Sequence, residues 1–433
     1  MAVHSSPLRT AYELCTTRKH VHRALSILSG FPLVILDCEG RSLGQSDGTL
    51  SLLCLGTPVA GDLQHVFLFD MQALAPCPRS RGAIAAFLER GPIKVCWDGR
   101  MDAIEIFHSF GIPLTGVLDL QVVEVVARQT VLGEKDRDRE ERLAKHKFGY
   151  RFVQEHRSRM GGVHVVRGLQ NCIEFYHPDL HVEKDPSVVE MHQNGETHRW
   201  MERPLPENLL HYAANDIRLI AHVLSIFDTL GFFQRDFWSL VEKSKRYIAR
   251  TERVRANEPL RPSGLLLLEA LSDEPAQHDC ARCGALLPIS CFENLSWRIE
   301  GARGAGVRRR HCQLCVTMSL RDHLTLPEEG SEWLETSQAP RSMIPPSTST
   351  SFSRPSYQQL YNPLRIVNEV ASSPCLQRSI AFNQSCIANP CEPVSGDWEC
   401  IRCTRQSCSS TCLSFADYCS SMDYYYLNLG TIG

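Results

Sequence analysis

The chain has 433 residues, more than one ordinary domain holds. Hydrophobic residues make up 43% and charged residues 22%, and these near-average values exclude a wholly disordered or fibrous protein. The net charge of −3 excludes a polycation but allows a local basic surface. The apolar run at residues 31–36 is too short to span a bilayer, and no signal-peptide pattern precedes it. We therefore expect an intracellular protein, cytoplasmic or nuclear, without membrane contact.

The first 240 residues alternate short apolar runs with helical patterns, after a helical lead-in expected at residues 1–28. Charges crowd residues 134–147, which indicates a solvated loop or an exposed helix, and a helical pattern resumes over 163–182. Alternating strands and helices predict an α/β fold in which helices cover a mixed sheet. We expect strands at 33–36, 50–55, 66–69, 93–97 and 117–120, and helices at 84–90, at 102–110 with Gly111 as its C-terminal cap, and at 207–230.

The rest of the chain differs in composition. A basic connector is expected at 241–277, a small Cys-rich unit at 278–325, and a mostly disordered Ser/Pro- and Cys-rich tail at 326–433, after a main domain at 29–240. Within the tail, the segment around Cys400 and Cys403 resembles the first half of a Ran-binding-protein-type zinc finger. The second half departs from that pattern, so we expect disorder there.

Two carboxylates, Asp37 and Glu39, follow the first predicted strand. Because side chains alternate along a strand, residues two apart point to the same face. Like charges held that close favour a cation between them, and Mg²⁺ prefers oxygen ligands of this kind. The alternative for such a pair is a solvated turn.

Three more residues are candidates for the same site. Asp102 falls in the first turn of a predicted helix, where it would also complement the helix dipole. Tyr212 and Asp216 are four residues apart within a predicted helix and therefore share a face. His211 competes with Tyr212, although a residue five positions from Asp216 is rotated further around the helix.

As a set, Asp37-x-Glu39, Asp102 and Tyr212-x-x-x-Asp216 resemble the motifs of the 3′–5′ exonuclease superfamily with four acidic residues and a tyrosine, the DEDDy type. The stretch from Trp200 to Asp216, which contains Arg-Pro-Leu, is similar to the third block of ribonuclease D-type proteins. Residues 97–102 and 118–121 are similar to blocks of fungal exonuclease-domain proteins. The resemblance covers roughly residues 30–235 and implies a ribonuclease H-like mixed sheet flanked by helices.

The resemblance also implies a reaction and its cofactors. Asp37 would bridge two Mg²⁺ or Mn²⁺ ions, Glu39 and Asp216 would complete the shell of the first, and Asp102 would support the second. Tyr212 would orient the attacking water. The chain would then release nucleoside monophosphates from the 3′ ends of RNA or DNA.

Outside the acidic residues, Arg100 is a candidate contact for substrate phosphates, with a solvated surface cation as the alternative. A relative of this type that has lost catalysis would instead be a nucleic-acid-binding or protein-interaction scaffold. The complete acidic set favours the enzyme.

Two Cys-x-x-Cys pairs, Cys280 with Cys283 and Cys312 with Cys315, are separated by 28 residues. Two such knuckles can supply four thiolates to a structural Zn²⁺, and the alternative is four free thiols in a loop. The run Arg308, Arg309 and Arg310 lies in the same unit. We expect it to contact nucleic-acid phosphates, with a solvated basic face as the alternative, and the zinc unit could also bind protein partners.

Overall fold

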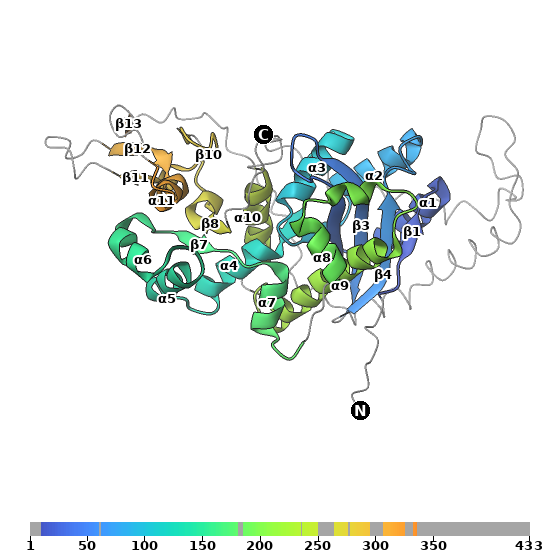
Figure 1. Ribbon diagram of the computed structural model, residues 1–433, viewed down its shortest axis with the longest axis horizontal. Coiled ribbons are helices and arrows are strands. Elements are labelled where there is room, and N and C mark those ends of the chain that lie inside the picture. The colour runs from blue at the N-terminus through green and yellow to red at the C-terminus, as the bar shows by residue number, and fades with distance from the viewer. Residues whose placement is uncertain are drawn as a thin grey trace, which may run out of the picture. The chain divides into compact units, whose positions relative to one another are not determined.

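The computed structural model describes residues 10–59, 62–180, 185–234, 236–249, 264–275, 278–294, 306–324 and 332–335 (Figure 1). All of these residues lie in the first of two compact units, residues 1–361 and 362–433. The expectations for the tail, including Cys400 and Cys403, fall outside the described residues. Among the described residues, no helix is long and apolar enough to cross a membrane.

A six-stranded mixed sheet is the centre of the fold, with the strand order β1-β4-β3-β2-β5-β6 (Figure 1). Neighbours among β2, β3 and β4 run antiparallel, β5 and β6 continue the sheet parallel to β2, and β1 pairs parallel with β4. This arrangement confirms the predicted ribonuclease H-like sheet. The strands are β1 (Glu13–Cys15), β2 (Leu33–Arg41), β3 (Thr49–Val59), β4 (Asp62–Asp70), β5 (Ile93–Cys96) and β6 (Val117–Asp119).

The apolar run at the start of β2 explains why this strand is central. Residues Leu33 to Leu36 are all buried, because β2 pairs with β3 on one side and β5 on the other and both of its faces are covered. A near-continuous apolar run is typical of such a strand. Strand β1 is a correction, since residues 1–28 were expected to be helical only. A strand of three residues is too short to show the alternation of apolar and polar side chains from which a strand is predicted.

The helices around the sheet largely follow the sequence pattern. α3 ends at Gly111, whose φ of 72° is the left-handed conformation expected of a C-terminal cap. The helical pattern at 163–182 is corrected to a strand, β7 (Val163–Val165), followed by a helix. The helices are α1 (Arg18–Leu28), α2 (Pro78–Arg90), α3 (Arg100–Phe110), α4 (Leu120–Thr130), α7 (Leu169–Tyr176), α8 (Pro186–Gln193), α9 (Glu207–Thr229) and α10 (Phe237–Ala249).

A second hydrophobic core joins residues 143–165 to the Cys-rich unit. It includes Leu143, Val163, Leu267, Cys280 and Phe292, so the charged stretch expected to be solvated in fact buries one face. Its elements are α5 (Asp136–Leu143), the π-helical turn η1 (Ala144–Phe148), α6 (Tyr150–His156), β7, β8 (Leu265–Leu267), β9 (His278–Asp279), β10 (Leu286–Leu287), β11 (Phe292–Asn294), β12 (Gly306–Cys312), α11 (Gln313–Arg321) and β13 (Glu332–Glu335).

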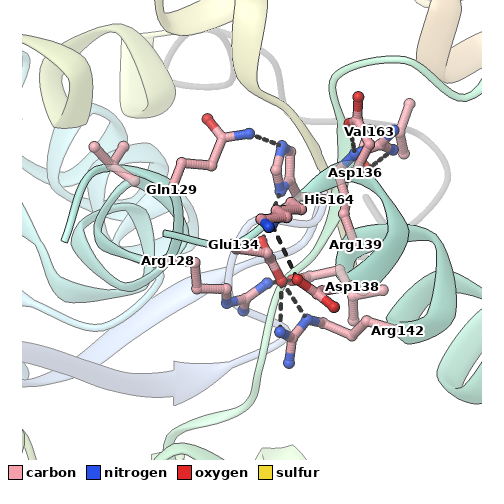
Figure 2. Close-up of polar contacts among 12 residues, drawn as sticks. Arg128, Gln129, Glu134, Asp136, Asp138, Arg139, Arg142, Val163 and His164 are labelled. Atoms are coloured by element: carbon pink, nitrogen blue, oxygen red, sulfur yellow. Dashed lines mark hydrogen bonds and ion pairs between the residues drawn. The ribbon is translucent and has the colours of Figure 1, made fainter. Parts of the chain in front are cut away.

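A buried polar network ties α5 to β7 (Figure 2). The Arg139 guanidinium donates to the carbonyls of Met160 and Val163 at 2.6 and 3.0 Å, and Glu134 accepts from Arg142. His164 lies fully buried beside them, and burial together with the neighbouring arginines lowers its pKa to about 3. The imidazole is therefore neutral, so this network contains no buried imidazolium charge.

Candidate active site

Three carboxylates converge where β2 meets α9. Oxygens of Asp37, Glu39 and Asp216 lie within 4.8 Å of one another. The pleat of β2 puts Asp37 and Glu39 on one face, and α9 packs against β2, β3 and β4 so that Asp216 reaches the same face. Glu39 is 6% and Asp216 8% exposed, while Asp37 is half-buried. Buried carboxylates this close repel one another unless a cation lies between them.

An ion pair that the sequence did not reveal fixes the start of α9. Arg203 donates to both oxygens of Asp70 at the end of β4, each at 2.8 Å, and to the carbonyl of Trp200 at 3.0 Å. Two parallel N–H···O bonds from one guanidinium fix orientation as well as distance. The Arg-Pro-Leu segment thus positions α9, and through it Asp216, against the sheet.

Tyr212 faces the carboxylates and His211 does not. The Tyr212 hydroxyl is hydrogen-bonded to Asp216, and burial plus the charges of Asp216, Glu39 and Asp37 raise the pKa of Tyr212. His211 instead lies 3.2 Å from Glu207, with its ring centroid 5.3 Å from that of Tyr12. Of the two alternatives left open by the spacing, the helix face presents the tyrosine.

Asp102 lies beside the three carboxylates but outside their group. The Cys38 thiol donates a hydrogen bond to it, and burial raises the pKa of Asp102 to about 7. Burial raises the pKa of the Cys54 thiol, and the charges of all four acidic residues raise it further. All four therefore lie around one stretch of β2 and β3. The structure therefore brings oxygens of three of them within 4.8 Å of one another. Asp102 is outside this group but near enough to act on the same Cys54 thiol.

Asp119 holds the loop that precedes α3, the helix whose first turn carries Asp102. The buried Asp119 carboxylate accepts the backbone N–H groups of Asp98, Gly99 and Gln121 at 3.2, 2.9 and 2.9 Å, and it caps α4. Burial raises its pKa to about 7.

Arg100 is hydrogen-bonded to the same loop. Its guanidinium donates to both oxygens of Asp98 at 2.6 and 2.8 Å and lies 4.7 Å from the centre of the Tyr247 ring. Tyr247 comes from α10, which sequence composition assigned to the basic connector. Contact between Arg100 and substrate phosphates stays a prediction.

A second candidate metal centre lies in the Cys-rich unit. The sulfurs of Cys280, Cys283, Cys312 and Cys315 lie within 4.8 Å of one another, and none of these cysteines forms a disulfide. The first pair lies between β9 and β10, and the second lies where β12 runs into α11. Thiol donors from its three neighbours lower the pKa of Cys280. Four convergent sulfurs are the donor set of a structural zinc site.

The three arginines near this centre have different surroundings. Arg309 is buried and pairs with Glu293 at 3.1 Å, and Arg308 donates to the Phe292 carbonyl at 3.0 Å. Arg310 is exposed. Of the predicted basic run, only Arg310 presents an exposed side chain, and its binding to nucleic acid stays a prediction.

No protein-family profile and no curated protein matches the chain. Among solved structures, Trypanosoma brucei RNase D is 23% identical, with 57% of this chain and 75% of that chain covered and a TM-score of 0.42. Escherichia coli RNase D, described as an exoribonuclease involved in structured RNA processing, is 17% identical, with 56% and 51% covered and a TM-score of 0.37. The EXO domain of Aedes aegypti Nibbler is 19% identical, with 50% and 86% covered and a TM-score of 0.34. By its own strand order the chain has a ribonuclease H-like mixed sheet, and three carboxylates gather on its β2 and on α9.

Proposed function

We propose that the chain is a metal-dependent 3′–5′ exonuclease that hydrolyses phosphodiester bonds at the 3′ ends of RNA or DNA. The observation that supports this most is the convergence of Asp37, Glu39 and Asp216 within 4.8 Å, with the Tyr212 hydroxyl on Asp216. A scaffold without catalysis would not need to keep mutually repelling carboxylates together.

The residues fit a hard divalent cation. Asp37, Glu39 and Asp216 supply carboxylate oxygens, the donors that Mg²⁺ and Mn²⁺ take, and Asp102 lies beside them for a second ion. Bound ions of this kind polarise the phosphate, lower the pKa of a water and stabilise charge on the attacking and leaving oxygens.

Tyr212 has the role of a hydrogen-bond group in this proposal. Because its pKa is raised, the hydroxyl keeps its proton at neutral pH and donates rather than abstracts. Its ring lies against Trp200, with centroids 6.4 Å apart, which fixes the direction of the hydroxyl. We infer that Tyr212 orients the attacking water or a phosphate oxygen.

Replacing Tyr212 by Phe is expected to lower kcat about 10- to 100-fold with little change in KM, because an orienting contact is lost while the carboxylates remain. The measurement is the rate at which a 5′-labelled oligonucleotide shortens from its 3′ end in Mn²⁺. His211→Phe is the matched control, one residue away on another face of α9, and should keep its activity. Loss of activity in the control but not in Tyr212→Phe would reverse the assignment.

For the Cys-rich unit, we propose a structural Zn²⁺ held by Cys280, Cys283, Cys312 and Cys315. Three of these, all but Cys283, are in or against the second hydrophobic core. The ion would therefore hold β9, β12 and α11 onto that core. We also propose that a protein partner could bind through this unit.

A further inference from the structure

The segment from residue 144 to residue 159 carries five basic residues and one acidic residue, Glu155, in a chain whose net charge is −3. We call Lys145, Lys147, Tyr150 and Arg151 the α6 face. All four are exposed, and Tyr150 leaves 63% of its surface to solvent. The segment thus combines three exposed cations with one exposed aromatic ring.

Local backbone structure displays these side chains. The turn η1 is π-helical, and Gly149, with φ at 81°, separates it from α6, which begins at Tyr150. Short π-helical segments are rare and often lie at functional sites. Arg151 pairs at 2.8 Å with Glu155, but both side chains are mostly exposed, at 92% and 52%. Such a pair is weak and leaves the guanidinium available.

The opposite side of the same segment is anchored. Ala144 and Val153 are buried in the second core, and the rings of Phe148 and Phe152 stack with centroids 5.3 Å apart and planes 13° apart. The buried network around Arg139 holds the preceding helix (Figure 2). The α6 face is therefore presented by a packed platform, so a ligand would not have to order it first.

Several cations act on one imidazole of this segment, that of His146. The pKa of His146 is lowered by burial and then by the charges of Lys145, Arg142, Arg167 and Lys147. The neighbouring acidic groups lie on α5, where Glu140 pairs with Arg157 at 2.8 Å. Lys145 and Lys147 have no ion pair with any residue that the structure describes.

We propose that the α6 face binds single-stranded nucleic acid, as the part of the substrate strand that lies 5′ of the end being cut. Lys145, Lys147 and Arg151 would contact successive phosphates, and a base would stack on Tyr150. Exposed cations alone would fit any polyanion, but the exposed ring among them favours a strand with unpaired bases. This inference rests on the proposed function for the identity of the strand.

The test is binding of fluorescent oligouridylate and oligodeoxythymidylate to the full chain in buffer without added Mg²⁺ or Mn²⁺, so that hydrolysis has no supplied ion. No chelator is added, so that the proposed zinc stays bound. Lys145→Ala/Lys147→Ala should reduce the slope of log affinity against log salt by about 0.7 for each lysine. Tyr150→Ala should weaken binding about 5- to 100-fold, while Tyr150→Trp should retain it, because either ring can stack. A blunt duplex should bind less tightly than the single strand.

Arg18→Ala/Lys19→Ala, on the exposed start of α1, removes the same charge elsewhere and is the matched control. Equal losses in this control and in the lysine pair would overturn the inference, as would unchanged binding in the Tyr150→Ala variant or preference for the duplex. The proposed function fails separately, if the wild-type chain with Mn²⁺ shortens neither oligonucleotide although the α6 variants still change binding without added Mg²⁺ or Mn²⁺.

Discussion

Replacing Asp37 by Asn is expected to slow nucleotide release from 3′ ends by more than about 100-fold, since even the outer partners of metal ligands are worth about 10- to 100-fold. The melting temperature without metal should stay the same or rise. Asp37 lies within 4.8 Å of Glu39 and Asp216, so removal of its charge relieves repulsion in the metal-free protein.

The two readouts are the rate of nucleotide release in Mn²⁺ and the melting temperature in buffer without added Mg²⁺ or Mn²⁺ and without a chelator. Asp47→Asn is a suitable control, because this carboxylate is 61% exposed in the loop after β2 and makes only a long contact of 3.9 Å to Arg41. It should leave both readouts unchanged. Full activity in Asp37→Asn, or a marked fall in its melting temperature, would contradict a metal-binding role for Asp37.

Replacing Cys283 by Ser is expected to release zinc and to destabilise the second core by several kcal/mol, since structural zinc contributes on the order of 10 kcal/mol in small modules. Cys283 is exposed, so the substitution removes a ligand without opening a cavity. The measurements are zinc content by atomic absorption and the rate of proteolysis within residues 278–324. We expect zinc to fall from about one ion per chain to none.

Cys77→Ser, a cysteine on the partly exposed start of α2, controls for loss of a thiol as such. It should keep its zinc and its protease resistance. Zinc retained by Cys283→Ser would show that the four sulfurs are not the binding site. Zinc absent from the purified wild type, with the unit still protease-resistant, would show that the fold does not need the ion.

Five of the six strands of the main sheet, β2 to β6, could be predicted because they carry buried apolar runs. Runs such as Leu33–Leu36 have no other place in a folded chain. The second core could not be predicted from α5, where charged residues crowd the sequence. Arg139 is buried there because two backbone carbonyls from around β7, as well as Asp136, accept its hydrogen bonds. No sequence pattern records the two backbone partners.

The candidate site could likewise be predicted only in part. Alternation along β2 predicted a shared face for Asp37 and Glu39, and helical spacing predicted one for Tyr212 and Asp216. Spacing could not choose between Tyr212 and His211, because that choice depends on which side of α9 packs against the sheet. The Arg203–Asp70 ion pair joins residues far apart in the chain and left no sequence signal.

The most direct measurement is Mn²⁺ binding to the full chain, followed by the loss of the free-ion signal in electron paramagnetic resonance. The account predicts that the wild type binds Mn²⁺ and that Asp37→Asn and Asp216→Asn each weaken this binding strongly, whereas Asp47→Asn does not. Equal Mn²⁺ binding by the wild type and both site variants would contradict the claim that these carboxylates form the metal site.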